Sequence, residues 1–221
     1  MAKIVARDRL MFALDVPSAM EADRLLDQLQ GHLTFVKVGL ELYTAAGPEI
    51  VKRIIGRGMR VFLDLKFLDI EETVRRATSR VAAMGVEFLT VHANRKALTA
   101  AVQGREGSSL KLLAVTVLTN FDSNDLREMG IQRTVQDLVT ARAVLASEVG
   151  CDGVVASGSQ DFVGSRFQEL DRVGFRESAW LDHLQLIQSE LRETECVKPL
   201  GTLVIGFLVL DGDMVTGDKD R

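Results

Sequence analysis

Three charged residues that could carry out chemistry, Asp64, Lys66 and Asp69, lie within six positions, directly after an apolar segment. Residues two apart in a β-strand point to the same face, so we expect Asp64 and Lys66 to lie side by side at the end of a buried strand. Asp69 lies beyond this strand. Because a charge costs much free energy to bury unless it is paired, the segment predicts either a structural ion pair or a reaction site.

A fourth charged residue, Lys37, extends this pattern of alternating sign, in which each group would keep its neighbour ionised. In a cavity that excludes water, such a network would present a fixed cation to a developing carbanion and a fixed anion to a leaving carboxylate. The alternative interpretation is a salt-bridge cluster that supports the rim of the fold. The charge pattern alone leaves both interpretations open.

Two further polar residues, His92 and Thr119, are expected at strand ends. A histidine there is more often a core or rim residue than a catalytic base, and Thr119 would either bind a ligand or form a turn. His32 and His183 have no partner pattern, so we assign them no role. The chain has no GxSxG, HExxH or P-loop motif, which leaves serine-hydrolase, zinc-protease and NTPase functions without a basis.

The composition predicts a soluble protein with one large domain. The 221 residues are 47% hydrophobic, which is ample for a core. A net charge of −4 argues against nucleic acid or an anionic membrane as a partner. The two cysteines, Cys151 and Cys196, lie far apart without a CxxC motif, so we expect reduced thiols. Residues 1–9 lack the apolar core of a signal peptide, and the longest apolar run, 203–210, is too short to cross a bilayer, so we expect a cytoplasmic location.

Short apolar strands alternate with longer amphipathic helices along the first part of the chain. Ser18 and Glu21 form the sequence pattern of a capping box, which predicts a helix from there to about residue 29. The other expected helices span residues 48–55, 71–84, 95–102 and 134–149, and the expected strands span 10–14, 35–38, 60–66, 88–92, 112–118 and 153–156.

Near-continuous apolar strands that alternate with helices predict a parallel sheet covered by helices, either doubly wound or closed as a barrel. A doubly wound sheet that binds a dinucleotide favours a glycine-rich turn after its first strand, but residues 15–18 contain no glycine. Polar residues instead recur at successive strand ends, which is how a (β/α)8 barrel builds its active site. These residues are Asp15, Lys37, Lys66, His92, Thr119 and Ser157. The barrel is therefore favoured.

The chain beyond residue 158 is less regular. Residues 161–176 are charged, 180–195 have a helical pattern, and 202–210 again read as a buried strand. No segment fits a seventh strand. We therefore expect one barrel domain with a core at 1–158, a divergent region at 159–221, and a barrel that is incomplete after its sixth strand.

In the segments that carry the strand-end charges, the chain resembles the orotidine 5′-phosphate decarboxylase family. The likeness follows the family's order and spacing from about residue 10 to residue 158, and DLKFLDI with Thr73 is its most specific part. The matching segments are FALD at 12–15, FVKVG at 35–39, DLKFLDI at 64–70, TVHA at 90–93, VTVLT at 115–119 and GVVASG at 153–158.

This resemblance implies a (β/α)8-barrel homodimer that converts orotidine 5′-monophosphate to UMP and CO2 in de novo pyrimidine biosynthesis. Such an enzyme is a carbon–carbon lyase that works without a metal or cofactor. By the resemblance, Lys66 would protonate C6 of the pyrimidine after CO2 leaves, and Asp64 would lie against the departing carboxylate. A nearby ammonium suits this reaction because it stabilises a carbanion strongly in a pocket with little water.

The resemblance also implies roles for residues around this pair. Lys37 would hold the Asp64 carboxylate and the ribose hydroxyls. Asp15 would bind the ribose side, and Thr119 would contact the base. Asp69, counted with the catalytic residues, and Thr73 would reach into the partner subunit's site. The dimer would then be part of the active site.

The phosphate-binding part of the family's pattern is missing. A Pro-Gly-Ile-Arg segment after strand seven, a gating loop with glutamine and a Gly-Arg pair after strand eight are all absent, and Phe207 stands where the arginine of that pair is expected. Glu71 also replaces a proline usual in the family. If codons 174–187 are read from their third base, they can spell Val-Pro-Gly-Ile-Arg-Leu-Ala-Gly-Ser-Pro-Ala-Ala-Asp. We therefore hypothesise that this region is translated out of frame relative to its ancestor.

Two alternatives to an active decarboxylase remain. The chain would be a catalytically impaired or inactive remnant of that enzyme, or a related magnesium-dependent sugar-phosphate decarboxylase or aldolase with a similar Asp-x-Lys-x-x-Asp motif. Ile70 and Thr73 after the motif favour the pyrimidine enzyme over the magnesium-dependent one.

Overall fold

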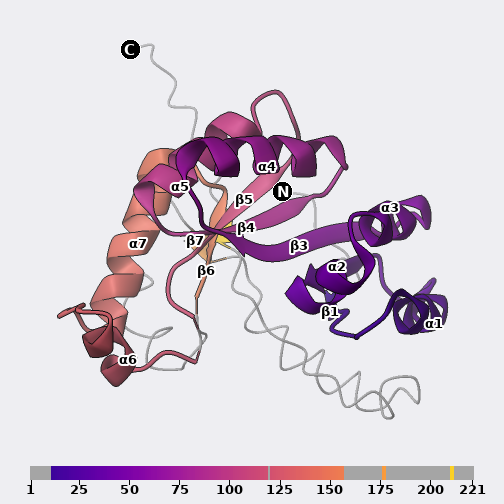
Figure 1. The fold of residues 1–221 in the computed structure, drawn as a ribbon, viewed down its shortest axis with the longest axis horizontal. Coiled ribbons are helices and arrows are strands. Elements are labelled where there is room, and N and C mark those ends of the chain that lie inside the picture. The colour runs from indigo at the N-terminus through magenta and orange to yellow at the C-terminus, as the bar shows by residue number, and fades with distance from the viewer. Residues whose placement is uncertain (1–10, 119, 157–175, 178–209, 212–221) are drawn as a thin grey trace.

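The computed structural model describes residues 11–118, 120–156, 176–177 and 210–211. Its main sheet contains six strands, all paired in parallel, in the order β1-β2-β3-β4-β5-β6 (Figure 1). A doubly wound sheet reverses its strand order where its ligand binds, whereas a barrel follows chain order. The sequential order confirms the barrel prediction, and the six strands form a half-barrel with alternating helices.

The observed elements follow the predicted alternation of strands and helices. The strands are β1 (Phe12–Ala13), β2 (Phe35–Gly39), β3 (Arg60–Phe67), β4 (Phe88–His92), β5 (Lys111–Val115) and β6 (Gly153–Val155). The helices are α1 (Ala19–Leu29), α2 (Leu40–Ala46), α3 (Glu49–Gly56), α4 (Glu71–Ala83), α5 (Arg95–Gly104), α6 (Ser123–Glu128) and α7 (Val135–Val149).

The clearest differences from the sequence prediction are two short helices and the end of strand β5. Helix α2 was not expected, because it begins directly after Gly39, which offers no capping side chain. Helix α6 also was not expected, although Asp122 and Asp125 form a complete capping box at its start. Strand β5 ends at Val115 instead of residue 118. Val115 pairs with His92, which is the final residue of β4.

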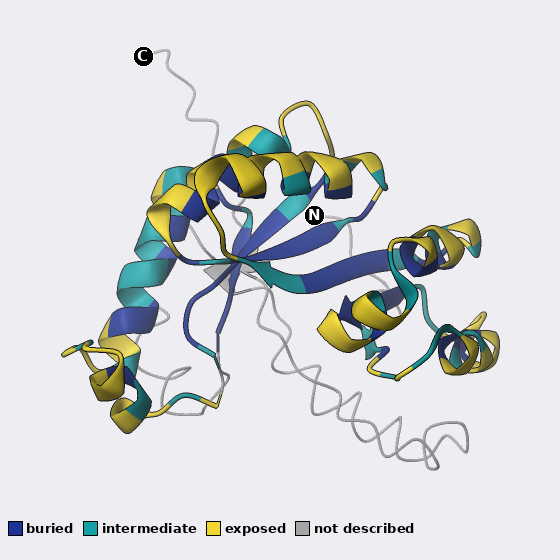
Figure 2. Cartoon of the chain, in the orientation of Figure 1, coloured by how far each residue is buried: buried dark blue, intermediate teal, exposed yellow. Residues whose placement is uncertain are grey.

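The helices lie around the outer face of the sheet, and most strand residues are buried (Figure 2). The face of the sheet that points away from these helices is called the inner face. Side chains alternate between these faces along each strand. A separate apolar cluster on the inner face comprises Phe35, Phe62, Phe88, Leu113, Val115 and Val155. Two residues further along their strands, Phe35 is followed by Lys37 and Phe62 by Asp64. The inner face is therefore apolar toward the amino ends of β2 and β3 and polar toward their carboxyl ends.

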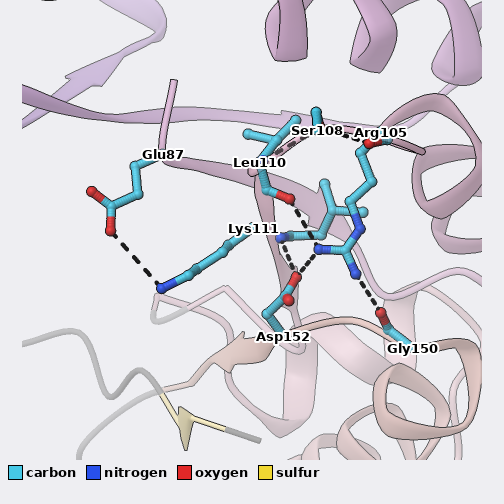
Figure 3. Close-up of polar contacts among 8 residues, drawn as sticks. Glu87, Arg105, Ser108, Leu110, Lys111, Gly150 and Asp152 are labelled. Atoms are coloured by element: carbon cyan, nitrogen blue, oxygen red, sulfur yellow. Dashed lines mark hydrogen bonds and ion pairs between the residues drawn. The ribbon is translucent and has the colours of Figure 1, made fainter. Parts of the chain in front are cut away.

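Charged residues cover the amino ends of the strands. The Arg60 guanidinium pairs with Glu87 and lies 4.5 Å from the centroid of the Phe35 ring. Lys111 Nζ lies 4.0 Å from the Glu87 carboxylate and 5.2 Å from the centroid of the Phe88 ring (Figure 3). In both contacts the charged group itself lies over the face of an aromatic ring of this cluster.

A second charged group at this end ties α5 to β5 and β6. The Arg105 guanidinium donates hydrogen bonds to the carbonyls of Leu110 at 3.0 Å and Gly150 at 2.7 Å, and it pairs with Asp152 (Figure 3). Asp152 in turn accepts the backbone N–H of Leu112 at 2.7 Å. These partly buried polar contacts have a structural role, because they lie at the strand ends opposite Lys37 and Asp64.

The last third contributes one described feature. Strands β7 (Arg176–Glu177) and β8 (Leu210–Asp211) pair antiparallel in a separate two-stranded sheet. The strand expected at 202–210 overlaps β8 only at Leu210, and this pairing is not that of a parallel barrel strand. The helix expected at 180–195 lies outside the described residues, as does Ser157. Among the described helices, none is long and apolar enough to cross a membrane.

Candidate active site

The carboxyl end of β3 carries the Asp64–Lys66 ion pair. Lys66 Nζ lies 2.8 Å from Asp64 Oδ2, and the two side chains are 29% and 7% exposed, respectively. The carboxylate is therefore held inside, while part of the lysine side chain remains open to an incoming molecule. The sequence prediction that these side chains lie side by side is confirmed.

The backbone at Lys66 departs from regular strand geometry. Its φ is +51°, which makes it the only non-glycine residue with a positive φ among those that the structure describes. The pairing register between β3 and β4 also shifts between Leu63 and Phe67. A bulge of this kind re-aims the side chains that follow it, and such bulges are frequent beside active sites.

Thr90 on β4 contacts both members of the pair. Its side chain is fully buried, its hydroxyl donates to Asp64 Oδ1 at 2.9 Å, and it accepts the Lys66 backbone N–H at 2.9 Å. Sequence reasoning did not single out this residue. The available signal was its position two residues before His92, which places a polar side chain on the inner face of a buried strand.

A second carboxylate–ammonium pair lies on the neighbouring strands. Lys37 Nζ on β2 lies 2.8 Å from Oδ1 and 3.1 Å from Oδ2 of Asp15, which follows β1. The lysine side chain is 5% exposed and the aspartate side chain 47% exposed. Gly39, two residues after Lys37, pairs with Asp64 across β2 and β3. The two ion pairs therefore occupy the same end of adjacent strands, but Lys37 contacts Asp15 and not Asp64.

His92 ends β4 and is half-buried near the same charges. Its pKa is lowered, first by burial and then by the positive charges of Arg142 and Lys66, with Asp64 acting in the opposite direction. The imidazole is therefore neutral near pH 7. Arg142 reaches this region from α7, where its guanidinium donates to the Thr116 carbonyl and burial lowers its pKa.

Two of the remaining predicted site residues, Asp69 and Thr73, do not join these pairs. Asp69 and Thr73 are exposed, on the loop after β3 and in the first turn of α4. The Asp69 carboxylate accepts the backbone N–H of Ile70 at 2.6 Å. Thr119 lies outside the described residues. Within the part of the chain that the structure describes, no group of three or more His, Cys, Asp or Glu side chains is placed to hold a metal ion.

The arrangement suits a reaction in which negative charge develops next to Lys66. Asp64 and Thr90 fix the position of the ammonium, which can stabilise that charge and then donate a proton to it. The buried Asp64 carboxylate would repel a second carboxylate brought into the site, which disfavours the bound reactant more than a product that has lost that group. The geometry therefore supports proton transfer coupled to departure of an acidic group.

Comparison with known proteins gives a consistent family assignment. The family model described as "Orotidine 5'-phosphate decarboxylase / HUMPS family" matches residues 8–174. The orotidine 5′-phosphate decarboxylase of Nitrobacter winogradskyi is 48% identical over 153 residues, which cover 69% of this chain and 64% of that protein. The enzyme of the same name from Methylobacterium nodulans is 45% identical over 157 residues, which cover 70% of this chain and 66% of that protein. The chain thus matches just under two thirds of the length of these curated relatives.

Solved structures give the same fold. The crystal structure of orotidine 5′-phosphate decarboxylase from Lactobacillus acidophilus has a TM-score of 0.66 and 32% identity, with 75% of each chain covered. An uncharacterised conserved protein from Geobacillus kaustophilus has a TM-score of 0.66 and 37% identity, with 74% of this chain and 77% of that chain covered. The family match ends at residue 174, where the segment that we expect to be out of frame begins.

Proposed function

The chain belongs to the orotidine 5′-phosphate decarboxylase / HUMPS family, and from this membership we propose that it converts orotidine 5′-monophosphate to UMP and CO2. The observation that carries the proposal is the Asp64–Lys66 pair at the end of β3, with its carboxylate buried and its ammonium partly open. This site combines a fixed negative charge with a proton donor, and the proposed reaction needs both.

In the proposed reaction, the bond between C6 of the pyrimidine and its carboxylate carbon breaks, and its electron pair stays on C6. The Lys66 ammonium stabilises this carbanion and then transfers a proton to it, so that C6–H forms and the amine later regains a proton from solvent. Asp64 lies against the departing carboxylate, and the two negative charges repel each other. This repulsion disappears once CO2 has formed. The attraction to the Lys66 ammonium is stronger in the transition state than with bound substrate, and the repulsion from Asp64 is weaker, so both effects accelerate the reaction itself.

The Asp15–Lys37 pair would bind the sugar. Two hydroxyls on neighbouring ribose carbons need both a hydrogen-bond acceptor and a donor, and a carboxylate beside an ammonium provides both. Lys37 is buried, whereas the Asp15 side chain is half exposed and so accessible to a ligand. Thr119 would contact the base.

We further propose a homodimer in which Asp69 and Thr73 complete the partner subunit's site. Both residues are exposed, and neither contacts the Asp64–Lys66 pair of its own chain. Two apolar side chains in the same loop are also exposed, with Leu68 at 59% and Ile70 at 73%. Apolar groups presented beside polar ones are common where two protein surfaces meet.

Turnover is expected to be low because the phosphate-binding segments of the family are absent from the sequence. Binding energy from a phosphate far from the reacting carbon is used to close the site and stabilise the transition state. Losing an arginine contact and its loop should cost several kcal/mol, and each ~1.4 kcal/mol corresponds to a tenfold slower reaction.

A decarboxylation assay on the purified full chain tests the proposal, following the loss of orotidine 5′-monophosphate absorbance. We expect slow turnover that a metal chelator does not change. Turnover abolished by the chelator would instead indicate the magnesium-dependent sugar-phosphate enzyme. Calorimetric titration with UMP covers the remaining case, because no binding at millimolar UMP together with no turnover would indicate an inactive remnant.

A further inference from the structure

We propose that Thr90 is a positioning residue that sets the Asp64 carboxylate and the Lys66 backbone in their working geometry through a single hydroxyl group. The inference rests on the proposed decarboxylation for its catalytic consequence. Its structural content, a hydroxyl on β4 that bridges two residues of β3 separated by Leu65, stands on the contacts alone.

The Thr90 hydroxyl both donates and accepts a hydrogen bond. Its proton goes to Asp64 Oδ1 at 2.9 Å, and its oxygen accepts the Lys66 N–H at 2.9 Å. A hydroxyl has one proton to donate, so the accepted bond fixes where that proton points. Thr90 is 0% exposed, so solvent does not compete for either bond.

The two oxygens of the Asp64 carboxylate have separate partners. Oδ1 accepts from Thr90, while Oδ2 lies 2.8 Å from the Lys66 ammonium. A carboxylate held at one oxygen has little freedom to rotate about its terminal bond. Thr90 therefore decides in which direction the second oxygen, and with it the ammonium, points.

Thr90 also contacts the unusual backbone at Lys66. A φ of +51° is unfavourable for a residue with a side chain, and such a conformation persists only where surrounding contacts hold it. The Lys66 N–H falls where the register between β3 and β4 shifts, and there it donates to the Thr90 hydroxyl. Thr90 thus supports the bulge that directs the lysine side chain toward Asp64.

The experiment compares Thr90→Val with Thr90→Ser. Valine keeps the shape and strand preference of threonine but removes both hydrogen bonds, whereas serine keeps the hydroxyl. We expect T90V to lower kcat by about 100-fold with KM nearly unchanged, because a small misplacement of a catalytic group has that effect. T90S should retain most of the wild-type kcat.

A matched control is Thr78→Val in α4. Thr78 is also 0% exposed, but its hydroxyl has no hydrogen-bond partner among the described residues. T78V therefore makes the same chemical change in the core without breaking a contact. It should leave kcat and KM at their wild-type values.

A second measurement needs no substrate. Hydrogen exchange of the Lys66 amide, followed by NMR on the full chain, should be faster in T90V and unchanged in T90S and T78V. If the wild type has no decarboxylase activity, the proposed function fails, and the exchange result alone decides whether Thr90 holds the bulge.

Several outcomes would overturn the role of Thr90. One is a T90V protein whose kcat equals that of the wild type, and another is a T90V protein that differs from the wild type only in KM. The third is a T90V protein in which the Lys66 amide exchanges as slowly as in the wild type. If T90V does not fold, Thr90→Cys provides the same comparison, since a thiol is a weak hydrogen-bonding group of similar size. A T90C protein with wild-type kcat and Lys66 exchange would equally refute the proposal.

Discussion

Lys37 places its ammonium against both carboxylate oxygens of Asp15, at 2.8 Å and 3.1 Å, and the backbone of Gly39 passes beside this pair. A Cβ atom at Gly39 would lie 3.0 Å from Asp15 Oδ1 and 3.4 Å from Lys37 Nζ. The absence of a side chain at Gly39 is therefore what leaves room for the ion pair.

Gly39→Ala should weaken ligand binding more than it weakens the fold. The added methyl displaces the Asp15 carboxylate, so we expect UMP to bind about tenfold less tightly, or ~1.4 kcal/mol, as measured by calorimetry. Gly56→Ala is the control, because a Cβ there meets nothing within 4 Å. Equal UMP affinity in the G39A and wild-type proteins would show that the pair does not bind the sugar.

Lys66→Ala should abolish decarboxylation while the chain still folds and dimerises. The substitution removes both the proton donor and the cation beside the developing carbanion, so we expect a loss of more than about 1,000-fold in kcat. Lys52→Ala is a matched control, since Lys52 is an exposed lysine whose partner is Glu49 on its own helix. Size-exclusion chromatography reports assembly, and a K66A protein with full turnover would refute the role of Lys66.

The order of strands and helices could be predicted from sequence because each apolar segment has a clear period and polar boundary. Strand β4 has the bounds expected from the sequence, and Ser18 and Thr134 cap α1 and α7 through their side chains. Helix α2 was missed because its start at Gly39 carries no such signal. Length matters as well as a cap: α4, with 13 residues, was predicted although Ile70 offers no capping side chain, whereas α6, with 6 residues, was missed despite its capping box.

The site was predicted less completely, because which groups pair depends on tertiary distances. The Asp64–Lys66 pair follows from strand periodicity alone, but the partner of Lys37 does not, since Asp15 follows one neighbouring strand and Asp64 lies on the other. The left-handed backbone conformation of Lys66 could not be predicted from the sequence either, because lysine has no preference for a positive φ. Geometry imposed by neighbouring strands decides such features.

His92 should make the folded state less stable as the pH falls. Its folded pKa is lowered from the ordinary value of 6.5, so between the two pKa values the unfolded chain binds more protons and stability rises with pH. The loss should begin as the pH falls through about 6.5 and continue down to the lowered pKa of the folded state. His92→Gln removes this contribution, so in urea unfolding the wild type should lose more stability than H92Q from pH 7.5 to 5.5. Parallel curves for the two proteins would contradict the prediction.

Gly104→Ala should destabilise the contact between α4 and α5. A Cβ atom there would lie 2.3 Å from the Arg75 carbonyl oxygen and 2.9 Å from Thr78 Cβ, so the two helices must separate. Overpacking of this kind typically costs about 1–3 kcal/mol, measured as the free energy of unfolding in urea. Gly56→Ala is again the control, because Gly56 also ends a helix but has open space beside it. A G104A protein as stable as the G56A protein would show that the helices do not approach this closely.

The nucleotide sequence of the gene should spell the family's phosphate-binding segment in a shifted frame. The family match ends at residue 174, and codons 174–187 read from their third base can encode Pro-Gly-Ile-Arg in the position where the family carries it. A chain rebuilt in that frame from residue 174 should bind UMP more tightly and decarboxylate faster, because an arginine contact to the phosphate contributes through charge-assisted hydrogen bonds. Calorimetry and the absorbance assay on the two chains provide the comparison. Codons that cannot spell the segment would refute the hypothesis outright, and a rebuilt chain without improved UMP binding would show that the restored segment does not hold the phosphate.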